Sequence, residues 1–443
     1  MAGGTWISQN KVRPGVYINF EARPQPLGSI GDRGIVAFPA DLPWGDPADV
    51  IVLNAAEYGD QSLELIGFNA ADSRIRHITS AVNHAQQVLL YRLGGSGATK
   101  ATATEGDLTA TAKWGGTRGN DLKIVVQANI DEPTLFDVVT LLDNDEVDRQ
   151  TVPDIAGLAA NSFIVWSGTG GLTATAGVSL TGGTDGSTTG ADFSAALSAF
   201  EAYQFNMLGI PLDDSTSKQL AVAYVKRQRE EEGKKIQAVL VNYPSADYEG
   251  IISLHNGIVA SDGLRVEPKY LVWEIAAMQA AANVNESLTY TAIPNAVDAY
   301  PRLTNSETIT ALKNGELVIT SLKGTVVIEQ DINTLTSFTI DRSKTFSKNR
   351  VMRVLDVIGN DVKRIFDAFY IGKVSNNADG RALLEAEIVS YLLSLQSLGA
   401  IQNFDSQTDI SVAQGNDVDS VVIGLSVQPV DSIEKIYITV EVV

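Results

Sequence analysis

The sequence contains no cysteine, only three histidines and no long hydrophobic run. Without cysteine there can be no disulfide framework, thiolate nucleophile or cysteine-ligated zinc, and three histidines leave little for a histidine-rich metal site. The N-terminus has no apolar export segment and no run of about 18 apolar residues occurs, so we expect neither Sec export nor membrane insertion. The sequence thus predicts a protein made in a cytoplasm, with no cofactor and no metal.

Positive charge is scarce as well. The 33 Lys and Arg are outnumbered by 53 Asp and Glu, which gives a net charge of -20 and a pI near 4.5. A surface this acidic repels a phosphate backbone, so we expect no direct nucleic-acid partner. The apolar content of 44% and the charged content of 19% are typical of a folded chain. Its length predicts two to four domains of roughly 100 to 200 residues each.

An α/β core is predicted from two separated stretches, residues 21–96 and 187–299. In the second stretch, apolar segments at 205–211 and 236–244 flank a helical segment, which is the pattern of a parallel βαβ unit. The apolar segment 88–93 of the first stretch is typical of a buried strand, and we expect it to join the same sheet. The fold class is therefore α/β, in an α+β multidomain chain with a discontinuous core.

Between the two halves of this core, residues 97–186 are dense in Gly, Thr and Ala. Short Thr/Val strands punctuated by glycine predict a small inserted all-β domain. It is acidic, with 12 Asp and Glu against five Lys and Arg. After the core, residues 300–432 predict a C-terminal α+β domain whose two amphipathic helices lie near 351–369 and 383–395.

Both ends of the chain have the alternating pattern of a half-buried strand. The N-terminal arm is predicted at 1–20 and the C-terminal arm at 433–443. Their alternating apolar residues are Val12, Val16, Ile18 and Phe20, and Ile436, Ile438, Val440 and Val442. A strand must pair its backbone groups, either within its own subunit or by addition to the sheet of another subunit. The pattern alone leaves both possibilities open.

No active site is predicted. The glycine cluster at 94–100 lacks the spacing of a phosphate loop, and Asp213 and Asp214 are better interpreted as helix caps. The acidic run at 141–148 lacks the glycine and the bidentate glutamate of a calcium loop. His77 and His84 share a helical face, but no carboxylate cluster accompanies them. We therefore assign no catalytic, cofactor-binding or metal residue.

One stretch departs from the acidic character of the chain. Residues 342–373 hold eight Lys or Arg and only three Asp. Such a stretch is either a solvated helix face or a basic surface for an acidic protein partner. The cations taken as contact candidates are Lys348, Arg350, Arg353, Lys363 and Arg364.

Three segments resemble the contractile phage tail sheath family: RPGVYINFEA at 13–22, GTRGNDLKI at 116–124 and VQPVDSIEKIYITVEVV at 427–443. The similarity is to the compact sheaths of phages, prophages and phage-tail-like bacteriocins of Gram-positive bacteria. The resemblance implies stacked hexameric rings around an inner tail tube protein, with terminal arms that complete a sheet in a neighbouring subunit. It also implies that the C-terminal domain faces the tube, which makes the basic stretch a candidate tube contact.

The function implied by this resemblance is structural. Such a sheath polymerises on the tube in a metastable state and contracts to drive the tube through a cell envelope, with baseplate and tail terminator proteins as further partners. The subunit would belong to a virion tail or phage-tail-like particle that is assembled in the host bacterial cytoplasm. The alternatives are a non-contractile self-assembling tube or shell protein, and an α/β enzyme. The enzyme would need a cluster of titratable residues at the strand ends, which the sequence does not show.

Overall fold

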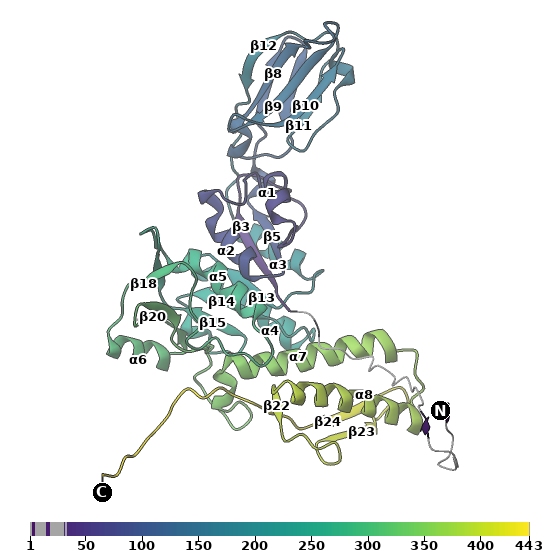
Figure 1. The fold of residues 1–443 in the computed structure, drawn as a ribbon, viewed down its shortest axis with the longest axis vertical. Coiled ribbons are helices and arrows are strands. Elements are labelled where there is room, and N and C mark those ends of the chain that lie inside the picture. Colours follow the sequence, from purple (N-terminus) through teal and green to yellow (C-terminus); the bar gives the residue numbers. More distant parts are fainter. Residues whose placement is uncertain (1, 5–14, 18–30, 32, 443) are drawn as a thin grey trace. The chain divides into compact units, whose positions relative to one another are not determined.

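The computed structural model describes residues 2–4, 15–17, 31 and 33–442. The chain divides into two compact units. The core unit comprises Gly31–Asn360 and Pro429–Val443, and the C-terminal unit comprises Asp361–Gln428 together with Met1–Ile30. The described residues form eight α-helices and several separate sheets (Figure 1). The predicted fold class, α/β within an α+β multidomain chain, is confirmed.

The core unit is built on a seven-stranded sheet with the strand order β19-β15-β14-β13-β3-β5-β4. Neighbouring strands run parallel except for β4, which is antiparallel to β5. The strands are β3 (Ile35–Asp41), β4 (Ile51–Asn54), β5 (Gln87–Leu93), β13 (Met207–Ile210), β14 (Gln237–Val241), β15 (Ile251–Leu254) and β19 (Glu316–Leu317). The central strands are apolar on both faces because helices cover the sheet on both sides. The predicted βαβ unit is confirmed as β13, α4 and β14.

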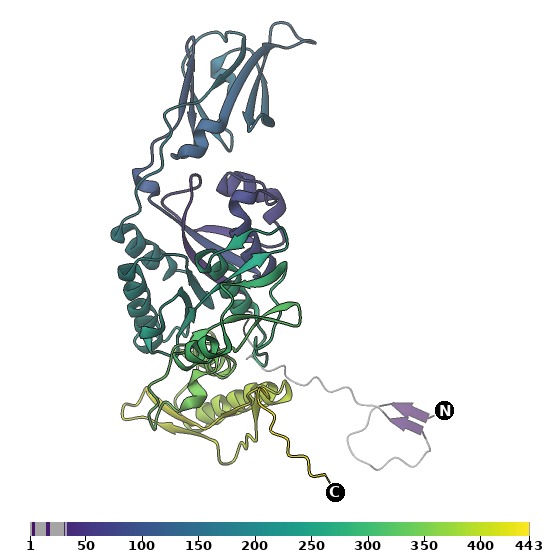
Figure 2. The ribbon, with the colours of Figure 1, turned by 90° about the vertical axis from the view of Figure 1, so that its left-hand side faces the viewer.

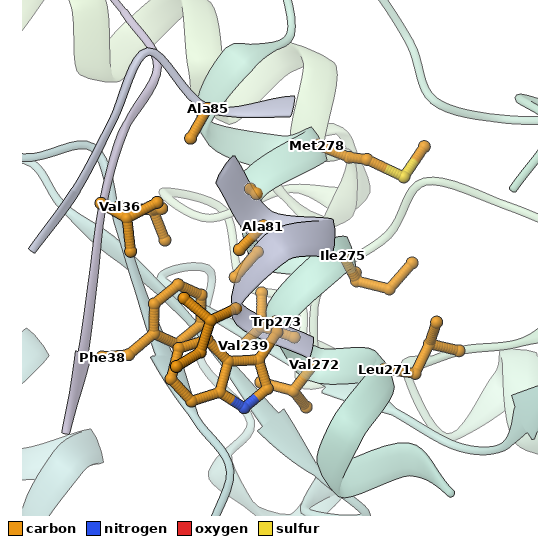
Figure 3. Close-up of a cluster of buried hydrophobic side chains, with 14 of the residues drawn as sticks. Val36, Phe38, Ala81, Ala85, Val239, Leu271, Val272, Trp273, Ile275 and Met278 are labelled. Atoms are coloured by element: carbon orange, nitrogen blue, oxygen red, sulfur yellow. The ribbon is translucent and has the colours of Figure 1, made fainter. Parts of the chain in front are cut away.

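Helices cover both faces of this sheet (Figure 1). One hydrophobic cluster joins it to α2 (Arg76–His84) and α5 (Pro268–Ala281), and a second joins its other face to α3 (Gly190–Phe200) and α4 (Ser215–Glu230). In the first cluster the ring of Phe38 stacks on that of Trp273, with centroids 4.1 Å apart (Figure 3). The predicted cap at Asp214 is confirmed, because its carboxylate accepts a 2.7 Å hydrogen bond from the Ser217 amide at the start of α4.

The all-β insertion lies between β5 and α3, as predicted. It consists of a four-stranded sheet, β10-β9-β8-β12, and a three-stranded sheet, β11-β7-β6, which enclose a hydrophobic cluster of their own. The strands are β6 (Thr102–Glu105), β7 (Leu108–Ala112), β8 (Leu122–Ala128), β9 (Phe136–Leu142), β10 (Asp145–Val152), β11 (Ile164–Ser167) and β12 (Thr175–Ser179). The acidic run at 141–148 forms the β9–β10 turn, in which Asp143 and Asn144 have φ angles of 55° and 74°. Such left-handed pairs are typical of tight hairpins.

Arg118 joins the insertion to the core. Its buried guanidinium donates to the carbonyl oxygen of Gly67 at 2.7 Å and to the carboxylates of Asp121 and Asp143 at 2.7 and 2.9 Å. A buried cation must have such partners, because burying it alone is costly. The GTRGND segment therefore has a structural role at the domain junction.

Residues 300–360 fold with the core unit, so the predicted C-terminal domain start at 300 differs from the structure. Strand β19 pairs with β15, and the hairpin β20–β21 contributes to the first hydrophobic cluster. The sharp turn of this hairpin contains Gly324, with φ at +88°. The other elements of the core unit are α1 (Tyr58–Ile66), β16 (Gly257–Ala260), β17 (Arg265–Val266), β18 (Ala296–Tyr300), α6 (Asn305–Lys313), β20 (Ile319–Leu322) and β21 (Thr325–Ile328).

The two predicted amphipathic helices are present. They are α7 (Asn349–Ile365), which crosses the boundary between the units, and α8 (Ala378–Ser397). The C-terminal unit also contains β22 (Ile401–Gln402), β23 (Ile410–Gln414), β24 (Val421–Leu425) and β25 (Gln428–Pro429). Helix α8 buries Leu384, Ile388 and Leu392, whereas Leu383 and Leu393 are 57% and 47% exposed. Its apolar residues thus extend beyond the buried face.

A buried carboxylate organises the polar interior of the core unit. Asp331, 1% exposed, accepts hydrogen bonds from Gln279 Nε2 at 2.6 Å, Asn349 Nδ2 at 2.8 Å and the Leu288 amide at 3.0 Å. The guanidinium of Arg353, also 1% exposed, lies 3.6 Å from it and donates to Gln279 Oε1 at 2.7 Å. This buried network joins α5, the segment after β21 and the first turns of α7.

We expect Arg353→Met to lower the free energy of unfolding by about 3–5 kcal/mol, because it leaves the Asp331 carboxylate buried without its cation. The matched control is Arg302→Met, which removes an exposed ion pair to Asp298 and should cost at most about 1 kcal/mol. Chemical denaturation of both variants measures the difference. Equal losses would contradict the role given to the network.

A pH dependence follows from His77, whose ring packs edge-on against Trp273 at a centroid distance of 4.9 Å. Burial lowers the pKa of His77 from 6.5 to about 4. Between these values the unfolded chain binds a proton at this position and the folded chain does not, so stability falls as pH falls. Between pH 7 and pH 5 we expect the parent to lose about 2 kcal/mol more than His77→Phe. Chemical denaturation at both pH values measures this loss. An equal loss of unfolding free energy in both proteins would refute the role given to His77.

Candidate assembly surfaces

The C-terminal segment is an extended chain without a strand partner. Figure 2 shows it without a helix or a strand arrow, and in the described structure no backbone hydrogen bond ties residues 431–442 to another segment. The four apolar residues predicted for strand exchange are exposed: Ile436 by 76%, Ile438 by 78%, Val440 by 78% and Val442 by 94%. An exposed apolar segment with unpaired backbone groups is a template for pairing with another sheet.

The predicted N-terminal arm is described only in part. Val16 lies in β2 (Gly15–Tyr17), which pairs in parallel with β1 (Ala2–Gly4), and Val16 is opposite Gly3. The other three predicted residues, Val12, Ile18 and Phe20, lie outside the described residues. The exchange of this arm stays a prediction.

The root of the C-terminal arm is held by one side chain, Glu434. Its carboxylate accepts hydrogen bonds from Thr289 Oγ1 at 2.9 Å and Gln330 Nε2 at 2.6 Å, and it forms an ion pair with Lys348. Burial opposes ionisation of Glu434, but the hydrogen bonds from Lys348 and Gln330 outweigh it and lower the pKa of the carboxyl group. The side chain is only 11% exposed, in contrast to the residues that follow.

An open groove of about 900 Å³ runs beside this root. Residues Asp431 to Lys435, which include the root of the arm, form part of its lining. Its apolar lining includes Tyr290, Ile309 and Phe338, which are 55%, 44% and 46% exposed. The groove therefore offers apolar surface next to the point where the arm leaves the core unit.

Two of the five cations predicted to form a basic surface are not available at the surface of the subunit. Arg353 is enclosed in the buried network, and Lys348, whose side chain is 15% exposed, is engaged by Glu434. Neither presents a free cation at the surface of the subunit. Arg350 is half-buried. Lys363 and Arg364, near the end of α7, are 49% and 44% exposed and pair with Asp367 and Asp361 of the same helical region.

The C-terminal unit contains a sheet of only two strands, β23 and β24, paired from Ile410 opposite Leu425 to Gln414 opposite Val421. The hairpin contacts α8, and Val422 on its other side is 59% exposed. No third strand pairs with either edge among the described residues. A two-stranded sheet is marginal in water, so its edges are suited to accept further strands.

In the described part of the core unit, charged residues around one cavity pair with each other. A cavity of about 580 Å³ is lined by parts of α2 and α5; its Arg76 pairs with Asp262, and Glu274 pairs with His84 at 3.3 Å. Across the described residues, no group of three or more His, Asp or Glu is placed to hold a metal ion. Within the same residues, no helix combines the length and apolarity needed to cross a membrane.

Models of three parts of phage tail sheath proteins match the chain: the β-sandwich domain at residues 95–185, the central domain at 186–334 and the C-terminal domain at 341–443. The chain is 37% identical to the uncharacterized protein YqbK of Bacillus subtilis and 34% identical to the phage-like element PBSX protein XkdK of the same species. Both alignments cover 100% of each chain.

Solved structures agree with this match. The sheath tail protein of Desulfitobacterium hafniense has a TM-score of 0.85 at 50% identity, over 96% of this chain and 99% of that chain. The sheath tail protein of Listeria innocua has a TM-score of 0.79 at 35% identity, over 94% and 96%. The anti-feeding prophage helical sheath in its contracted state, at 13% identity and a TM-score of 0.58 over 97% and 99%, shares the fold. This chain belongs to the phage tail sheath protein family, a family of structural tail components and not of enzymes.

Proposed function

We propose that this chain polymerises around an inner tail tube as stacked hexameric rings and contracts to drive the tube through a target cell envelope. The observation that carries this proposal is the C-terminal arm, which exposes apolar side chains and offers its backbone no partner within the described subunit. In a polymer the arm gains that partner. The particle is a virion tail or a phage-tail-like particle, assembled in the host bacterial cytoplasm, in which baseplate and tail terminator proteins bind the two ends.

The arm adds to the hairpin β23–β24 of another copy. The two-stranded sheet β20–β21 is a poorer recipient, because Val326 and Ile328 are buried in the main cluster and Val327 already bridges to Ala292. Pairing through backbone hydrogen bonds supplies affinity, while the alternating apolar side chains of the arm select the face that packs inward.

Contraction then follows as a rigid-body rearrangement of subunits that remain tethered by their arms. Interfaces between packed subunits are bistable rather than continuously deformable, so a ring can pass from one packing to another as a unit. A non-contractile tube or shell would use the same arms but only one packing. A change in helical rise between two assembled states distinguishes the contractile sheath from this alternative.

Tube contact is assigned to the exposed cations of the C-terminal unit, Lys363 and Arg364, with half-buried Arg350 as a further candidate. Lys363 and its partner Asp367 are both exposed, by 49% and 53%. An exposed pair of this kind is weak, so an acidic partner can compete for Lys363. The partner of Arg364, Asp361, is buried, so Arg364 is held more firmly in its place.

The arm is tested by Ile438→Asp, compared with Thr439→Asp at the next position. A charge on the inward face of an added strand is buried without a partner, whereas one on the outward face remains in water. Negative-stain electron microscopy should therefore show sheath-like tubes for the parent and Thr439→Asp, but not for Ile438→Asp. If both variants assemble like the parent, the arm is not added as a strand.

Tube contact is tested with the double variant Lys363→Glu/Arg364→Glu. Charge reversal should weaken co-sedimentation with the tube protein by about tenfold or more, because attraction becomes repulsion. The control, Lys100→Glu/Lys323→Glu, makes the same net charge change at exposed lysines of the insertion and of the β20–β21 turn. Equal loss in both variants would show that net charge, and not this surface, governs binding.

A further inference from the structure

The C-terminal segment changes character at Glu434. Up to this residue the chain is attached to the core unit, and from Lys435 to Val442 every residue is exposed. The attachment consists of side-chain contacts to one carboxylate, since no backbone hydrogen bond holds the described residues 431–442. A single anchor at the root of a free segment determines where that segment starts and in which direction it leaves.

We propose that Glu434, through its contacts with Lys348, Gln330 and Thr289, is the positioning residue of the C-terminal arm. It fixes the exit point and direction of residues 435–442, so that the arm meets one recipient sheet. This inference rests on the proposed strand exchange, and it assigns to Glu434 a role that the alternating apolar residues of the arm cannot fill.

The anchor is suited to this role because its donors come from three separate segments. Thr289 follows α5, Gln330 follows β21, and Lys348 directly precedes α7. Contacts from three directions restrict the carboxylate in position and orientation, which two contacts from one loop would not do. The low exposure of the side chain, 11%, limits competition from water.

One of the three donors, Thr289, is itself held by the buried network. Thr289 Oγ1, which donates to Glu434, accepts a 2.9 Å hydrogen bond from the Asp331 amide. The Asp331 carboxylate in turn binds Gln279 and Asn349, both fully buried. The arm therefore starts from the rigid interior of the core unit and not from a surface loop. Such support behind the contact residues is what a precise site requires.

The neighbouring groove shows why an anchor matters. Its apolar lining, with Tyr290, Ile309 and Phe338, lies beside the exposed Ile433, which is 87% exposed. The root already lies at this groove, and without the anchor burial of apolar surface would draw the apolar arm residues that follow it onto the same lining. Glu434 holds the root in place, and residues beyond it stay available to another subunit.

The absence of cysteine allows a direct test with two spin labels, at Ser306→Cys in α6 and Lys435→Cys at the start of the arm. In the dilute full-length chain we expect a narrow distance distribution for the parent. Glu434→Ala should make the distribution about twofold wider, because the root gains access to alternative positions. Glu434→Gln, which keeps the acceptor for Thr289 but loses the ion pair, should be intermediate. Glu441→Ala, at an exposed glutamate of the same arm, should match the parent.

Assembly is measured on the same proteins. We expect the concentration needed for tube formation to rise about tenfold in Glu434→Ala and to stay at the parent value in Glu441→Ala. A mobile arm loses more conformational entropy on binding, which weakens assembly. An unchanged distance distribution in Glu434→Ala overturns the positioning role, and so does a broadened distribution with normal assembly. A parent that forms no tubes refutes the proposed function instead, while the spin-label distances still decide whether Glu434 fixes the root.

Discussion

The buried carboxylate of Asp331 is the constraint on which much of the core unit depends. A carboxyl group that is 1% exposed is stable only when surrounding donors replace its lost hydration. Those donors come from α5, from the segment before β18 and from α7, so satisfying one carboxylate fixes three elements that are distant in sequence. The same network reaches the root of the C-terminal arm through Thr289. The hydrogen bonds that this buried carboxylate requires therefore also support the side chain that holds the root of the proposed assembly arm.

Much of the fold could be predicted from the sequence, because long apolar runs and helical periodicity are local signals. The strands at 88–93, 205–211 and 236–244, the inserted β domain and the two late helices are all present in the structure. The predicted boundary at 300 differed because β19 is a two-residue strand whose pairing with β15 is non-local. Neither its length nor its composition reveals that it adds to the core sheet.

The candidate site was harder to predict, because the sequence does not reveal whether a charged side chain is buried or exposed. Lys348 and Arg353 looked like part of one basic surface, yet their partners, Glu434 and Asp331, are 86 and 22 residues away in the chain. Glu434 itself was not singled out. The only signal was a single acidic residue that precedes the alternating apolar arm, and a charged residue in that place is equally typical of a solvated linker. Alternation does mark Ile436, Ile438, Val440 and Val442, which are exposed in the described subunit, but their role in strand exchange stays a prediction.

The arm and its proposed recipient, the hairpin β23–β24, both have unpaired backbone groups. Residues 435–442 have exposed apolar side chains at every second position and unpaired backbone groups, and the hairpin β23–β24 is a two-stranded sheet with free edges among the described residues. Each deficit is removed if the arm of one copy adds to the hairpin of another. Such exchange links subunits through backbone hydrogen bonds that survive large rigid-body movements, which is what a contracting lattice needs.

The most direct test of this account is a cryo-electron microscopy map of tubes assembled from the full-length chain, at a resolution that traces residues 435–442. The account predicts that the arm leaves its core unit after Glu434 and forms a third strand on the β23–β24 hairpin of a different copy. An arm that folds back onto its own subunit, or a β23–β24 hairpin that remains two-stranded in the assembled tube, would contradict it.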